Sequence, residues 1–104
     1  MILFYGRHVR FLHRLGLIYI EGGGGMDDLE ILALLEQRSD RAIDALAERF
    51  GSLLLRIAMN LVDNSQDAEE CVNDTYLAVW NSVPPNHPLP LQPYICRICR
   101  NIAI

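Results

Sequence analysis

From residue 26 onward, apolar side chains recur every three or four residues in four separate stretches, which is the spacing of an amphipathic helix. The first stretch, 29–37, predicts a short helix. The second, 39–61, keeps helical spacing for more than five turns, and Ser39 is suited to cap its start. Gly51 is expected to weaken this long helix by about 1 kcal/mol relative to alanine without ending it.

Two more helices are predicted after a turn at residues 63–65. The third runs from about Gln66 to Ser82, with Asn64 or Ser65 as its cap, and the fourth begins near Leu91. For the third helix, the side chains expected to face inward are Ala68, Cys71, Val72, Thr75, Val79 and Ser82. For the fourth helix, they are Tyr94, Ile95, Ile98 and Ile102, with Arg97, Arg100 and Asn101 facing outward.

Prolines at positions 84, 85, 88 and 90 separate the third and fourth predicted helices. Because proline lacks an N–H donor and restricts the residue before it, this segment is expected to form a stiff, extended loop. No strand-like alternation competes with the helices. The sequence therefore predicts an all-α fold, a compact orthogonal bundle of about four helices over residues 26–104. The fourth pattern is still running at Ile104, so we expect the domain to be incomplete at its C-terminus.

Residues 1–25 differ from the rest, because basic and apolar residues are mixed and the segment ends in four glycines. The sequence Glu-Gly-Gly-Gly-Gly-Met fits a purine-rich ribosome-binding site followed by a start codon. We therefore expect Met26 to be the native start and the preceding extension to be non-native or disordered. The alternative is a basic amphipathic tail that contacts a membrane.

The formal charge of −4 conceals a strong segregation along the chain. Twelve of the thirteen acidic residues lie between Asp27 and Asp74, and none follows Asp74. The acidic part suits a basic protein partner, whereas the C-terminal part can approach a polyanion. The simpler alternative is an uneven solvated surface.

Cysteine content and motifs argue against several classes of protein. Cys71, Cys96 and Cys99 are an odd number without a disulfide framework, which favours reduced thiols in the cytoplasm. A pair of thiolates in Cys96-x-x-Cys99 supplies only half of a structural zinc site, so we expect no metal and no cofactor. No catalytic motif is present, which predicts a non-enzymatic protein. No apolar run reaches about eighteen residues, so no stable membrane association is expected.

Three blocks of the sequence resemble the second region of extracytoplasmic-function sigma factors, the subunits that direct bacterial RNA polymerase to promoters. The blocks are Phe50 to Ala58 (FGSLLLRIA), Asp67 to Trp80 (DAEECVNDTYLAVW) and Arg97 to Ala103 (RICRNIA). The middle block is the most specific. Pro93, Tyr94 and Cys99 depart from the residues common in that family.

The resemblance implies that the third helix docks on a coiled coil of the largest subunit of core RNA polymerase. It also implies that the loop and fourth helix open and read the upstream minus-ten promoter element as a non-template single strand. An anti-sigma factor is a further partner that the resemblance suggests. The residues expected to bind core polymerase are Glu70, Asn73, Asp74 and Leu77. The residues expected to bind DNA are His87, Arg97, Arg100 and Asn101.

The chemistry of these residues fits those roles. Carboxylates on one helix face can pair with arginines of a basic coiled coil. Arg97 and Arg100 are three residues apart and can hold neighbouring phosphates, while Asn101 can bond a base edge. By analogy with the family, 87–90 is where a flipped base would be held. Trp80 and Tyr94 are expected to be core aromatics rather than stacking platforms.

A rival interpretation is a small helical adaptor whose acidic face binds a basic protein. In that case the acidic residues only form the solvent-exposed face of an amphipathic helix. The arginines of the fourth helix then only interact with its dipole.

Overall fold

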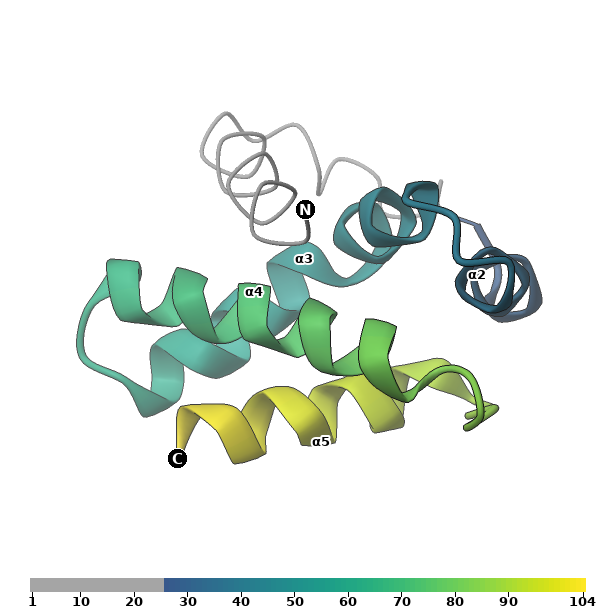
Figure 1. The fold of residues 1–104 in the computed structure, drawn as a ribbon. Helices are drawn as coiled ribbons and strands as arrows, with labels where there is room; N and C mark the ends of the chain where they lie inside the picture. The colour runs from purple at the N-terminus through teal and green to yellow at the C-terminus, as the bar shows by residue number, and fades with distance from the viewer. Residues whose placement is uncertain (1–25) are drawn as a thin grey trace.

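A computed structural model describes residues 26–104 as helices packed around one core (Figure 1). The helices are α2 (Asp28–Glu36), α3 (Arg41–Leu61), α4 (Ser65–Ser82) and α5 (Leu91–Ala103). Residues 26–104 contain no strand, so the predicted all-α fold of about four helices is confirmed. None of the helices in this part of the chain is long and apolar enough to cross a membrane. The predictions for residues 1–25 lie outside the described residues.

Local capping explains where α2 begins. The Asp27 carboxylate accepts a hydrogen bond from the Glu30 backbone N–H at 2.9 Å, and the Glu30 side chain accepts one from the Asp27 N–H at 3.0 Å. This reciprocal pair satisfies two donors that a helix N-terminus would otherwise leave open. Such a cap contributes about 1 kcal/mol.

The predicted cap of the long helix is displaced by one residue. The N-cap of α3 is Asp40, which makes no side-chain capping bond, while the Ser39 hydroxyl accepts from the Arg41 N–H at 3.3 Å. The Ser39 backbone belongs to the end of α2, because its N–H donates to the Leu34 carbonyl. The turn is this short because Arg38 takes a positive φ of 58°. Gly51 lies inside the continuous α3, as predicted.

Helix α3 forms the centre of the core, and α2, α4 and α5 all pack against it. In Figure 1, α4 and α5 run side by side across α3, and α2 lies toward one end. The largest fully buried side chains are Tyr76, Phe50, Ile31, Leu32, Leu35, Ile43, Leu46, Leu54, Leu91, Ile95, Val79 and Val83. The core therefore draws on every helix and on the residue that follows α4.

The predicted inward face of α5 is wrong in part. Ile95 is buried, but Ile102 is 36% exposed, and both Cys96 and Cys99 face the core. The Cys99 thiol donates to the Leu54 carbonyl of α3 at 3.6 Å. Small thiols let α5 lie close to α3, whereas the prediction was based on the largest apolar side chains. Leu29 in α2 and Leu61 at the end of α3 are also exposed, although both are large apolar residues.

The buried Tyr76 hydroxyl of α4 has no hydrogen-bond partner among residues 26–104, and burial raises its pKa. A desolvated hydroxyl without a partner costs free energy. We expect Tyr76→Phe to leave the free energy of unfolding unchanged or to raise it by about 1 kcal/mol, measured by urea denaturation.

Tyr94→Phe is the matched control, because the Tyr94 hydroxyl bonds to Ser82 at 2.7 Å and to Asn86 at 3.0 Å. This substitution should lower the free energy of unfolding by about 1 kcal/mol. Equal destabilisation by both substitutions would contradict the unsatisfied state of the Tyr76 hydroxyl.

Candidate functional site

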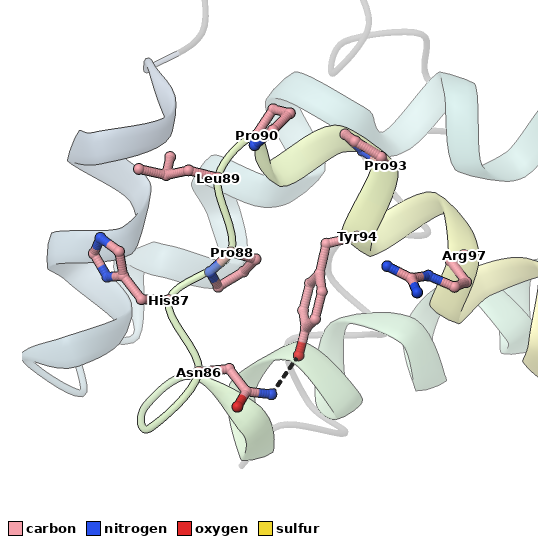
Figure 2. Close-up of a pocket in the computed structure, with 8 residues that line it drawn as sticks. All are labelled: Asn86, His87, Pro88, Leu89, Pro90, Pro93, Tyr94 and Arg97. Carbon is pink, nitrogen blue, oxygen red and sulfur yellow. Dashed lines mark hydrogen bonds between the residues drawn. The ribbon is translucent and has the colours of Figure 1, made fainter.

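The residues between α4 and α5 form, with the first turns of α5, a surface pocket of about 460 Å³ (Figure 2). We call residues 83–90 the linker. The residues lining the pocket are Asn86, His87, Pro88, Leu89, Pro90, Pro93, Tyr94 and Arg97. The predicted non-helical loop is confirmed here, since no residue of the linker is helical.

Tyr94 ties the linker to the two helices that flank it. Its hydroxyl shares a hydrogen bond with the Ser82 hydroxyl at the end of α4, and accepts one from the Asn86 amide in the linker. In Figure 2 the Tyr94 ring stands between the linker and Arg97, so one ring face forms a wall of the pocket. Tyr94 is half-buried and packs against the core, so it is both a core aromatic, as predicted, and a pocket wall.

The pocket combines an apolar lining with polar groups at its rim. Proline rings, Leu89 and the Tyr94 ring supply flat apolar surface, while Asn86 and Arg97 supply hydrogen-bond donors. A volume of about 460 Å³ lies in the usual range for sites that bind small molecules. A flat heteroaromatic ring attached to an anionic group suits such a pocket, because the ring can stack and the anion can pair with the guanidinium.

His87 is placed differently from a freely exposed contact residue. Its Nδ1 lies 2.8 Å from the Glu36 carboxylate at the end of α2, and Figure 2 shows the ring directed toward that helix. Both side chains remain about half exposed. His87 therefore lines the pocket while its ring contacts Glu36 of α2.

The structure separates the three predicted contact residues of α5. Arg97 lines the pocket, whereas Arg100 and Asn101 lie further along the helix and outside the lining. All three residues are exposed, and within 26–104 their side chains form no hydrogen bond or ion pair with another residue. Arg97 and Arg100 are one turn, about 5 Å, apart along the axis and so face the same side. Together they form a cationic edge that leads away from the pocket.

The other predicted surface lies on α4. Glu70 and Asp74 are exposed and four residues apart, so they share a face, and Asn73 and Leu77 beside them are half-buried. The Asn73 side-chain oxygen is buried without a hydrogen-bond partner in the described part of the chain. The negative potential of this face reaches Cys71, whose pKa is raised by burial and then by Asp74, Asp67 and Glu70.

Trp80, the other aromatic predicted for the core, is half-buried and packs against it. The Arg38 guanidinium lies 3.9 Å from its ring centroid, which is a cation–π geometry. The same guanidinium donates to the carbonyls of Trp80 at 3.0 Å and Val83 at 2.9 Å. Sequence reasoning did not select Arg38, because an arginine between two helices carries no local signal of a contact 45 residues away.

Two of the cysteines belong to the hydrophobic core and not to the pocket lining. Cys96 and Cys99 are buried, and burial raises the pKa of both thiols. Each is therefore a neutral thiol near pH 7. Within residues 26–104, no cluster of three or more His, Cys, Asp or Glu side chains is arranged to hold a metal ion.

A comparison with protein families finds a match to part of the chain. The family model described as Sigma-70 region 2 matches residues 46–104. That range contains α4, the linker, α5 and most of α3, and hence both candidate surfaces. No curated protein and no solved structure matches the chain.

Proposed function

This chain belongs to the sigma-70 region 2 family, and from that premise we propose that it binds core RNA polymerase and recognises and melts the minus-ten promoter element. The observation that carries the proposal is the pocket between the linker and α5, with Arg97 at its edge. A base unstacked from the upstream element would enter the pocket, and its phosphate would meet the cationic edge.

Polymerase docking is proposed for α4. Glu70 and Asp74 point into solvent from one face, which suits salt bridges with a basic coiled coil of the largest subunit. Asn73 and Leu77 lie beside them.

Charge makes DNA binding conditional on that docking. From Met26 onward the chain has six arginines against twelve acidic residues, a formal charge of −6. Such a domain repels a polyanion on its own, and the polymerase would supply the missing positive field. We therefore expect promoter binding only in the assembled holoenzyme.

The block from Asp67 to Trp80 supports assignment to the extracytoplasmic-function group, acting in the cytoplasm and regulated by an anti-sigma factor. The largest-subunit coiled coil and the non-template strand are the specific partners proposed.

The proposed DNA contacts are of two kinds: phosphate contacts that position the strand and a base contact that recognises its sequence. In the holoenzyme, Arg97→Ala or Arg100→Ala should weaken binding of all single strands similarly, with the log–log salt slope reduced by about 0.7 for each lost phosphate contact. Asn101→Ala should instead relax discrimination at one base position, by about 1–3 kcal/mol, with an unchanged salt slope. Fluorescence anisotropy of labelled single strands across a salt series measures both quantities.

Arg41→Ala is the control, since Arg41 is an exposed arginine at the start of α3, outside the pocket lining. It should change neither quantity. If Asn101→Ala lowers affinity equally for every sequence, Asn101 does not read a base. If the parent holoenzyme has no affinity for promoter-like single strands, the adaptor interpretation replaces the sigma-factor one.

A further inference from the structure

The linker has few hydrogen bonds of its own. Its backbone N–H groups form two bonds back to α4, from Val83 to Val79 and from Asn86 to Ser82, and its prolines have no N–H to donate. A loop with so little internal bonding is held in one shape by contacts from outside. The residues that make those contacts with the linker therefore maintain the shape of the pocket.

The last residue of α2, Glu36, and Arg38, two residues after it, contact the first half of the linker. The Arg38 guanidinium donates to the Val83 carbonyl at 2.9 Å, where the linker begins. The Glu36 carboxylate lies 2.8 Å from His87 Nδ1, in the middle of the linker. Figure 2 shows the linker passing beside α2, with His87 and Leu89 on the α2 side.

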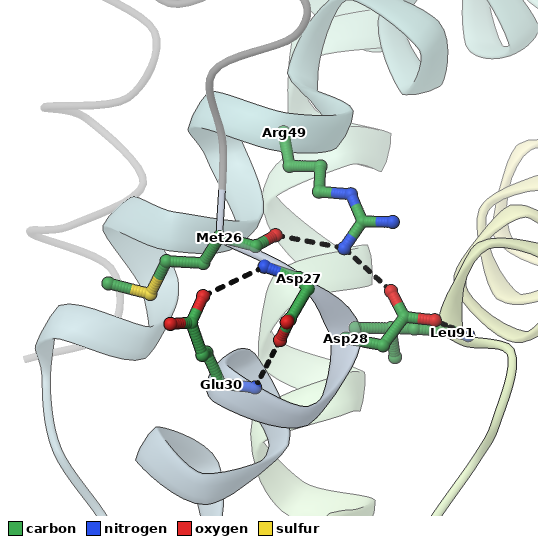
Figure 3. Close-up of polar contacts among 6 residues, drawn as sticks. All are labelled: Met26, Asp27, Asp28, Glu30, Arg49 and Leu91. Atoms are coloured by element: carbon green, nitrogen blue, oxygen red, sulfur yellow. Dashed lines mark hydrogen bonds and ion pairs between the residues drawn. The ribbon is translucent and has the colours of Figure 1, made fainter.

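The first turn of α2 contacts the other end of the linker, where α5 begins. The Asp28 carboxylate accepts a hydrogen bond from the Leu91 N–H, the first residue of α5, at 3.0 Å (Figure 3). Its other oxygen lies 2.6 Å from the Arg49 guanidinium of α3, which also donates to the Met26 carbonyl at 2.9 Å. The α5 N-cap is Pro90, whose side chain has no polar atom to cap the helix. Asp28 therefore supplies from another helix the carboxylate that a helix N-terminus favours.

We propose that α2 is a splint for the linker, with Asp28, Glu36 and Arg38 as positioning residues that keep the pocket ready to accept a base. This inference rests on the proposed DNA reading. All three residues precede the matched range 46–104, so the splint lies outside the part of the chain that the family model covers. A preformed pocket binds its ligand without first ordering the loop, and losing the splint transfers that ordering cost to DNA binding.

The test measures base discrimination by the holoenzyme. Its probe is a labelled single strand carrying the upstream element, compared with strands in which one nucleotide at a time is abasic. The parent should prefer the intact strand by about tenfold at the position held in the pocket. Asp28→Ala should reduce this preference to about twofold or less, whereas Asp28→Asn, which keeps an acceptor for the Leu91 N–H, should retain most of it.

Asp27→Ala is the matched control, because the Asp27 carboxylate makes the same kind of bond to a backbone N–H, but that bond is to Glu30 within α2. It should lose stability while keeping the full preference for the intact strand. If Asp28→Ala keeps that preference as well as Asp27→Ala does, the splint is refuted.

A second measurement does not depend on DNA. Hydrogen exchange of the Leu91 amide in the full chain should be faster in Asp28→Ala than in Asp27→Ala, and close to the parent rate in Asp28→Asn. Unchanged exchange in Asp28→Ala would overturn the splint. Faster exchange together with a parent holoenzyme that shows no base preference would support the splint and refute the proposed DNA reading.

Discussion

Replacing both Glu70 and Asp74 by arginine is expected to abolish measurable binding to core RNA polymerase, with a loss of about 2–5 kcal/mol. Both side chains are exposed on one face of α4. Reversal would remove two attractions to a basic coiled coil and would set cations against cations in a partly desolvated interface. Core polymerase titrated into labelled domain, followed by anisotropy, measures the affinity.

The matched control is the double reversal of Glu48 and Asp63, which changes the net charge equally. Glu48 is on α3 and Asp63 is in the turn before α4, and both are exposed. This control should bind within about threefold of the parent, because scattered surface charges act weakly at physiological salt. Circular dichroism should show both variants folded. Parent-like affinity in the Glu70 and Asp74 variant would move the docking surface away from α4.

Phe50→Ala is expected to lower the free energy of unfolding by about 3–5 kcal/mol. The Phe50 side chain is 1% exposed in the middle of α3, the helix on which the others pack. Removing it leaves a cavity in the core, and the loss is a large part of the roughly 5–15 kcal/mol by which folded proteins are typically stable. Urea denaturation gives the change in the free energy of unfolding.

Met59→Ala tests the same helix at a position that is 43% exposed. It should cost less than about 1 kcal/mol, because little surface is returned to water. Similar losses at Phe50 and Met59 would contradict the burial of Phe50 in the core.

Sequence periodicity predicted the helical elements well because the apolar positions of α3 and α4 repeat without interruption. The boundaries differ by one or two residues, as at Ser39, where a tight turn displaced the expected cap. Which side chains of α5 are buried was harder to predict. A side chain as large as Ile102 would normally be expected inside, but α5 packs on α3 through Cys96 and Cys99.

Less of the candidate site could be predicted, for a different physical reason. Arg97 and His87 were selected by motif, and both line the pocket. The residues that fix the pocket's shape act over long sequence separations, as Asp28 does on Leu91 across 63 residues. A single sequence gives helical periodicity, but it does not show which charged side chain will meet a distant backbone group. The roles assigned to the contact residues remain predictions.

The continuous course of α3 has a consequence for exchanging this domain between proteins. The helix runs from Arg41 to Leu61, so the matched range, which starts at residue 46, begins inside it. A chimaera joined at that boundary would cut a helix after its first turn and would take α2 from its host. The transplanted promoter specificity would then depend on how the host helix fits the incoming linker. A junction placed before Asp27 would transfer the recognition residues together with the contacts that shape them.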